Sequence, residues 1–183
     1  YGDGGAVFTN DKYLSEKIHS LRLHGKDNHK YKYKYIGTNS RLDTIQAGVL
    51  LEKLKIFENE IHLREKIASQ YKEALNNIVL SQKISNFKNS VWAQFTINLK
   101  NENIRNEIMS RLSLKKIPTN IYYPIPLHLQ KAYINFPKDP DGLYVSEYLS
   151  RSLLSLPMHP YLNKNEINFI TDSLNMELKK LNL

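Results

Sequence analysis

Four short stretches of the 183-residue chain contain residue types that bind anions or flat rings: KYKYKY (30–35), TNSRLDTIQAG (38–48), PTNIYYPIPLH (118–128) and LSLPMHPYL (154–162). In KYKYKY, lysine cations alternate with tyrosine rings, a pattern that can neutralise phosphates and stack on bases. The same pattern is also typical of a solvated loop. If it binds phosphate, a small nucleotide fits better than a polymer, because no helix-turn-helix, RRM or KH pattern accompanies it.

The second stretch has the composition of a helix N-terminus that binds an anion. We expect Asn39 or Ser40 to cap the helix and Asp43 to complement its positive end. Helix N-termini bind anions, and the Arg41 guanidinium can bind a carboxylate or phosphate through two parallel hydrogen bonds. The alternative is a structural role, in which these residues supply a cap and an Arg–Asp pair within the fold.

Tyr122 and Tyr123 lie at the end of a predicted strand, followed by Pro124 and Pro126. Adjacent strand residues face opposite sides, so we expect one tyrosine in the core and the other in a cleft. The alternative is that both rings simply pack. His159 in the fourth stretch is by itself more typical of a structural histidine. The six histidines lack the HxxxH and HExxH spacing of metal sites, so we expect no metal.

The elements that position these stretches follow from periodicity and capping residues. Before residue 80 we expect a short strand at 6–8, a helix starting after Thr9, Asn10 or Asp11 and ending at Gly25, and a loop to Gly37. Leucines and isoleucines at helical spacing then predict two helices, or one long bent helix, over 41–78.

In the second half of the chain, the spacing of apolar residues changes from helical to alternating in the first segment and returns to helical afterwards. This order indicates a small antiparallel sheet covered by helices. Following a polar linker at 80–90, Val91, Ala93, Phe95, Ile97 and Leu99 alternate with polar residues as a half-buried strand does. The remaining expected elements are a helix over 104–112, a strand at 118–123, a short helix at 127–133, a loop at 134–142, a helix at 143–153 and a final helix capped by Asn163.

Composition narrows the class of protein. The chain has 26 Lys and Arg against 18 Asp and Glu, a formal charge of +8, which favours anionic partners such as nucleotides. It has no cysteine, which excludes disulfides and thiolate metal sites and fits a cytoplasmic protein. No apolar run approaches the roughly 20 residues that span a bilayer, so we expect no membrane partner. A basic nucleic-acid-binding module led by KYKYKY remains a less favoured alternative.

Taken in order, these stretches resemble the DegT/StrS-type sugar aminotransferases, which use pyridoxal 5'-phosphate (PLP). The resemblance covers residues 1–180 through the following sequences: GDGGAVFTND, RLHG, NSRLDTIQAGVLLEKL, WAQFTI, PTNIYYPIPLH and LSLPMHPYL. It implies an α/β fold, the C-terminal part of an aspartate-aminotransferase-like (fold type I) transferase. Residues 1–57 would end the large PLP-binding domain, and 58–183 would form a connecting helix and an α+β small domain.

The resemblance also implies roles for particular residues. Asn39 matches an asparagine that reaches the PLP phosphate of the partner subunit, and Arg41 an arginine suited to an anionic substrate group. Tyr122 and Tyr123 match a pair that contacts the sugar nucleotide across the dimer interface, although close relatives can carry His at the first position. The lysine that forms the Schiff base with PLP is expected just before Tyr1, so no catalytic residue is assigned within this chain.

The implied protein is a cytoplasmic homodimer with shared active sites that binds no nucleic acid. It would transfer an amino group, with glutamate as donor, to a keto sugar linked to a nucleotide, for surface polysaccharide or glycan synthesis. The stretches NSRLDTIQAG, YYPIPL and SLPMHPYL are most similar to those of aminotransferases that act on a UDP-linked 3-keto sugar, such as UDP-2-acetamido-2-deoxy-3-oxo-glucuronate. The alternative is an inactive or dehydratase-like relative with the same fold.

Overall fold

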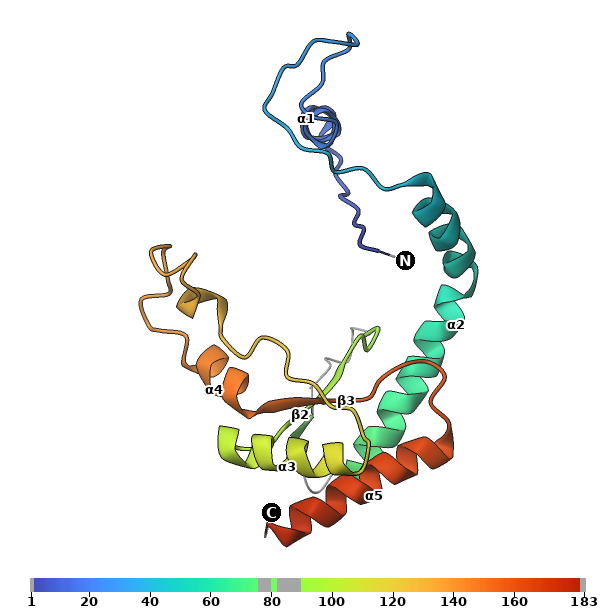
Figure 1. Cartoon of the computed structure of the whole chain (residues 1–183), viewed down its shortest axis with the longest axis vertical. Helices are drawn as coiled ribbons and strands as arrows, with labels where there is room; N and C mark the ends of the chain where they lie inside the picture. Colours follow the sequence, from blue (N-terminus) through green and yellow to red (C-terminus); the bar gives the residue numbers. More distant parts are fainter. Residues whose placement is uncertain (1, 76–79, 82–89, 182–183) are drawn as a thin grey trace. The chain divides into compact units, whose positions relative to one another are not determined.

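The computed structural model describes residues 2–75, 80–81 and 90–181 (Figure 1). It divides into two compact units, Tyr1–Glu58 and Asn59–Leu183, and each is described by itself. The boundary between them falls within one long helix, α2 (Thr44–Leu75). Within the described ranges, no helix combines the length and the apolar character that a membrane crossing requires. The domain boundary expected between residues 57 and 58 stays a prediction about the intact protein.

The first unit contains α1 (Lys12–Arg22), which begins and ends where its sequence indicates. Asp11 is the N-cap among the three candidates, because its Oδ1 accepts a 3.0 Å hydrogen bond from the Leu14 amide. After the helix, Gly25 adopts a φ of +77° and its amide donates to the Ser20 carbonyl at 2.8 Å. A residue in this left-handed conformation is the usual way to end a helix.

The strand expected at residues 6–8 does not form. Val7 is 69% exposed and Phe8 is 92% exposed, and neither belongs to a strand. A strand needs a hydrogen-bonded neighbour and a packed face, and no strand among the described residues pairs with this segment. The apolar pattern was therefore insufficient to specify the local structure.

The range 41–78 forms one helix, α2, of 32 described residues, and residues 76–78 lie outside the described part. The prediction that Asn39 or Ser40 caps it is wrong. The helix begins after Asp43, whose carbonyl accepts from the Ala47 amide at 2.9 Å. Ser40 instead donates its amide to the Arg22 carbonyl at 2.9 Å, so it is tied to the end of α1.

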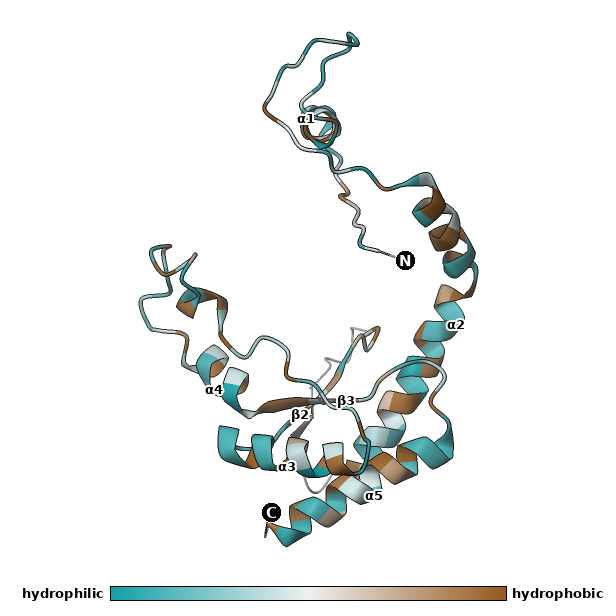
Figure 2. Cartoon of the chain, in the orientation of Figure 1, coloured by the Kyte–Doolittle hydropathy of each residue, from teal (hydrophilic) through white to brown (hydrophobic). Residues whose placement is uncertain are grey.

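The second unit is built on an antiparallel sheet in the order β1-β2-β3, with β1 (Leu80–Ser81), β2 (Phe95–Asn98) and β3 (Leu153–Leu156). Most of the polar linker expected at 80–90 lies outside the described residues, but its first two residues form β1. The register places Phe95 opposite Leu156 and Asn98 opposite Leu153. Figure 2 shows apolar residues along β3, which is central to the buried core.

Two strand predictions need correction. Residues 118–123 form only a single bridge, between Asn120 and Ser155, because the neighbouring apolar segment 153–156 occupies the position beside β2. The strand expected over 91–99 begins only at Phe95. Trp92 has a φ of +47°, which interrupts the alternation, so Trp92 is 1% exposed whereas Val91 is 50% exposed.

Helices cover this sheet much as the periodicity predicts. They are α3 (Glu102–Leu114), α4 (Tyr144–Ser152) and α5 (Lys164–Lys180), while the helix expected at 127–133 is reduced to a 3-10 turn, η1 (Leu127–Leu129). Asn163 caps α5 as predicted. Its Oδ1 accepts from the Glu166 amide at 3.0 Å, and the Glu166 carboxylate accepts in return from the Asn163 amide at 2.8 Å.

The buried core joins α2, α3 and α5 to β2 and β3. Tyr71 of α2 is fully buried, stacks 5.0 Å from Phe95 and donates its hydroxyl to the Pro157 carbonyl at 2.9 Å. Burial raises the pKa of Tyr71, so this hydroxyl keeps its proton. The other apolar core residues include the following: Ile67, Ala68, Leu75, Trp92, Ile97, Leu99, Ile108, Leu112, Ile117, Leu154, Leu156, Ile167, Ile170, Leu174 and Leu178.

A buried carboxylate links the C-terminal helix to α3. Glu177 is 3% exposed and is paired with Lys115 at 2.9 Å, Lys180 at 3.0 Å and Arg111 at 3.1 Å. These cations, Lys115 foremost, lower the pKa of Glu177 to about 2. The pairing fixes α5 against α3, and none of its members is a predicted site residue.

Candidate functional site

Two predicted site residues of the first unit, Asn39 and Arg41, are brought together. The Arg41 Nε donates a 3.0 Å hydrogen bond to the Asn39 Oδ1, and both side chains are exposed. The Asn39 amide nitrogen and the two terminal nitrogens of Arg41 make no other hydrogen bond among the described residues, so they remain as donors. A phosphate or carboxylate accepts hydrogen bonds only, so this donor set suits either group.

Beside this pair, the backbones of Gly25 and Gly37 pass in close contact, and we call this contact the glycine crossing. A Cβ on Gly25 would lie 1.8 Å from the Tyr35 carbonyl oxygen, and one on Gly37 would lie 2.2 Å from the Gly25 nitrogen. His24 donates its amide to the Thr38 carbonyl at 2.9 Å, and Asn39 forms a bridge with Leu23. The segment that presents Asn39 is therefore fixed to the end of α1.

The lysine–tyrosine hairpin, residues 26–36, extends from this crossing. Tyr31 is 78% exposed and Tyr33 is 62% exposed. The ammonium groups lie over neighbouring rings, with Lys30 at 5.3 Å from the Tyr31 centroid and Lys34 at 5.4 Å from that of Tyr35. Such contacts leave the positive charge accessible. The hairpin can thus attract an anion, and its role in binding diphosphate stays a prediction.

In the second unit, the expectation that Tyr122 and Tyr123 face opposite sides is wrong. Tyr122 is 44% exposed and Tyr123 is 82% exposed, so neither belongs to the core. Strand alternation does not apply, because this segment is not a strand and Tyr123 has a φ of +56°. Both tyrosines line the same cleft, and their role as ligand contacts stays a prediction.

This aromatic cleft has a volume of about 580 Å³. Four of its lining side chains carry aromatic rings: Tyr122, Tyr123, Tyr133 and Phe136. The Tyr133 and Phe136 centroids lie 5.7 Å apart at an interplanar angle of 57°. Lys138 is the lining residue with an ammonium group. Stacking surfaces beside one cation suit a flat ring that carries negative charge elsewhere.

His128 fixes one wall of the aromatic cleft. Its Nε2 lies 3.1 Å from the Glu147 Oε1, which ties η1 to α4. Tyr133 and Phe136 were not predicted as site residues. Tyr133 falls at the end of the expected helix at 127–133 and Phe136 in the expected loop at 134–142, and only the folded chain places both in one cleft with Tyr122. The aromatic spacing of three residues after a proline-rich stretch is the one clue that the sequence offers.

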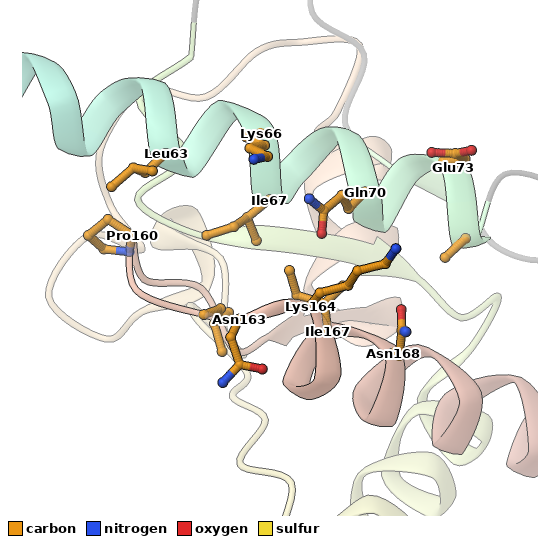
Figure 3. Close-up of a pocket in the computed structure, with 12 residues that line it drawn as sticks. Leu63, Lys66, Ile67, Gln70, Glu73, Pro160, Asn163, Lys164, Ile167 and Asn168 are labelled. Atoms are coloured by element: carbon orange, nitrogen blue, oxygen red, sulfur yellow. The ribbon is translucent and has the colours of Figure 1, made fainter.

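A larger groove of about 770 Å³ lies between α2 and the start of α5 (Figure 3). Its floor includes Ile67 and Ile167, which are 4% and 3% exposed, and its rim carries Lys66 and Lys164. None of the predicted site residues lines it. Among the described residues, no three side chains of the His, Cys, Asp or Glu type gather in a way that could hold a metal ion.

Comparison with known proteins gives a consistent result across the whole chain. The model of the "DegT/DnrJ/EryC1/StrS aminotransferase family" matches residues 1–175. A curated relative from Pseudomonas aeruginosa, UDP-2-acetamido-2-deoxy-3-oxo-D-glucuronate aminotransferase, is 41% identical over 175 residues, which is 95% of this chain and 47% of the relative. The chain therefore spans about half the length of the curated relatives it matches.

Solved structures agree with this result. A DegT DnrJ EryC1 StrS aminotransferase from Brucella abortus superposes with a TM-score of 0.85 at 44% identity, covering 92% of this chain and 44% of that one. The structure of S. venezuelae DesV in complex with a ketimine intermediate superposes with a TM-score of 0.83 at 30% identity, covering 93% and 46%. The fold predicted from the sequence is thereby confirmed.

Proposed function

The chain belongs to the DegT/DnrJ/EryC1/StrS aminotransferase family, and from this premise we propose that the protein is a PLP-dependent aminotransferase that aminates a keto sugar linked to a nucleotide. The observation that carries the proposal is the aromatic cleft at Tyr122 and Tyr123 in the second unit, which suits the flat base of a nucleotide. Separately, the donor set of Asn39 and Arg41 in the first unit suits a phosphate or a carboxylate.

The donor set at Asn39 fits the phosphate of PLP. The Asn39 amide nitrogen and the two terminal nitrogens of Arg41 are available donors, while the Asn39 oxygen already accepts one hydrogen bond from the Arg41 Nε. PLP, when bound, supplies an electron sink for the exchange of the amino group. In this proposal Asn39 holds the phosphate, and Arg41 both orients Asn39 and binds an anionic group of the substrate.

For the substrate we propose a UDP-linked 3-keto sugar, because the relative from P. aeruginosa carries that substrate in its name. Tyr122 and Tyr123 contact the nucleotide sugar at the aromatic cleft. Glutamate is the proposed amino donor, and the product enters surface polysaccharide or glycan synthesis. The cytoplasmic location stays a prediction.

We further propose that the protein is a homodimer with shared sites. Asn39 and Arg41 are exposed and have no hydrogen-bond partner beyond each other among the described side chains, which suits residues lent to a partner's site. The alternatives, an inactive or dehydratase-like relative and a nucleic-acid-binding module, receive no support from the comparisons.

The decisive experiment incubates the protein, expressed from its complete coding sequence, with PLP, glutamate and a UDP-linked 3-keto sugar. The amino group leaves glutamate and replaces the keto oxygen, so 2-oxoglutarate and the UDP-linked amino sugar must appear in equal amounts. Mass spectrometry detects both products. A protein that binds PLP and the sugar nucleotide but forms neither product would contradict the proposal.

A further inference from the structure

A second cavity of the second unit shares Tyr122 with the aromatic cleft. We call it the polar pocket. It has a volume of about 410 Å³, and its lining residues are Ala93, Gln94, Pro118, Thr119, Asn120, Tyr122, Ser155, Leu156, Pro157, Met158 and His159. Tyr122 is the one residue that lines both this pocket and the aromatic cleft. Tyr122 therefore borders two cavities whose lining residues differ in chemistry.

The polar pocket contains amide, hydroxyl and imidazole groups but no carboxylate or ammonium group. Some of these groups are already used. The Ser155 hydroxyl pairs with that of Thr96 at 2.9 Å, and the Asn120 Oδ1 accepts from the Ile121 amide at 3.0 Å. Among the described residues, the side chains of Gln94 and Thr119 have no hydrogen-bond partner, so they remain available to a ligand.

His159 is held in one orientation. Its Nδ1 accepts a 3.3 Å hydrogen bond from the Tyr161 amide. A neutral imidazole that accepts at Nδ1 carries its proton on Nε2, so the outer nitrogen is a donor. His159 is exposed, and that donor can therefore reach a ligand in the polar pocket.

We infer that the polar pocket is the sugar subsite of a two-part site and that His159 donates to a sugar hydroxyl or carbonyl there. The inference rests on the proposed function. Neutral donors and acceptors suit a hydroxyl-bearing ring, whereas an anionic group would find no cation in this pocket. The aromatic rings of the neighbouring cleft suit the base. Tyr122 lines both cavities, so one ligand that occupied both would contact this residue.

The test measures binding of UDP and of UDP-N-acetylglucosamine to the full protein by calorimetry. In His159→Asn, the amide oxygen takes the place of Nδ1 and keeps the bond to Tyr161, but the outer donor is lost. In His159→Gln, the amide nitrogen takes the place of Nε2 and keeps that donor. We expect His159→Asn to bind UDP-N-acetylglucosamine about three- to tenfold more weakly, with UDP binding unchanged. His159→Gln restores the affinity.

Thr119→Val supplies a second variant, since it removes a hydroxyl at nearly constant volume and should also weaken only the sugar-containing probe. His62→Asn is the matched control, because His62 is exposed on α2 and lines neither cavity. Wild-type affinity of both pocket variants for UDP-N-acetylglucosamine would overturn the sugar subsite and leave the proposed function standing. Equal weakening of both probes by His159→Asn would also overturn it. A wild-type protein that binds neither probe would contradict the proposed function itself.

Discussion

The Nε of Arg41 donates a 3.0 Å hydrogen bond to the Oδ1 of Asn39, so the guanidinium determines which end of the amide is available. The amide nitrogen of Asn39 is left as a donor, and a ligand that only accepts hydrogen bonds can bind both residues at once. In the proposed function these two exposed side chains act as one anion-binding group, and this role can be tested directly.

Arg41→Lys should weaken the binding of PLP to the apoprotein about tenfold. An ammonium group lacks the Nε–H and the planar fork, so it neither orients Asn39 nor binds an anion through two parallel bonds. Fluorescence titration with PLP measures the change, and circular dichroism verifies that the variant is folded. A folded Arg41→Lys protein with wild-type affinity would exclude this role for Arg41.

Gly25→Ala should destabilise the protein by about 2 kcal/mol or more. The residue has a φ of +77°, and its new Cβ would collide with the Tyr35 carbonyl. Gly48→Ala is the control, because no atom lies within 4 Å of its Cβ position and alanine favours the helix by about 1 kcal/mol. Thermal unfolding compares the two. A Gly25→Ala protein as stable as Gly48→Ala would show that the glycine crossing is not rigid.

Tyr71→Phe should lower the free energy of unfolding by about 1 to 2 kcal/mol. The substitution keeps the ring against Phe95 but leaves the Pro157 carbonyl without its donor. Tyr148→Phe removes a 3.3 Å contact with Asn98 from an exposed tyrosine and should change stability by less than about 0.5 kcal/mol. Urea unfolding of both variants provides the comparison, and equal effects would argue against a specific role for the buried hydroxyl.

Glu177→Gln should reduce stability at neutral pH and should also remove part of the acid sensitivity. The folded pKa of about 2 lies below the ordinary value of 4.5, so the folded state binds fewer protons here than the unfolded state. The contribution of Glu177 is therefore complete above pH 4.5 and is lost as the pH falls toward 2. Urea unfolding at several pH values should show the wild-type advantage shrinking over this interval. An advantage that stays constant down to pH 2 would contradict the assigned pairing.

The helices were predictable from the sequence because their determinants are local. Asp11 and Asn163 cap α1 and α5 as their sequences indicate, and the bonds that do so span three residues. The strands were less predictable, because pairing depends on distant segments. Residues 118–123 have the composition of a strand, yet 153–156 takes the place next to β2.

The candidate site was predictable only in part. The Asn39–Arg41 pair is close in sequence, and the residue types indicate anion binding. The aromatic cleft was not predictable, because Phe136 and Tyr122 meet only through the turn around η1 and α4. A positive φ at Trp92 reverses the face that simple alternation assigns to it, and a positive φ at Tyr123 marks a segment to which alternation does not apply. Alternation holds only where the backbone is extended.

The closed base of the lysine–tyrosine hairpin has a consequence for protein engineering. Gly25 and Gly37 meet through their backbones, and the His24–Thr38 hydrogen bond closes the same base. Residues between them can therefore be exchanged for loops of other length and charge without altering the register of Asn39. Chimaeras that carry other loops on this base would therefore change how strongly the hairpin attracts anions. The position of the Asn39–Arg41 pair would stay the same.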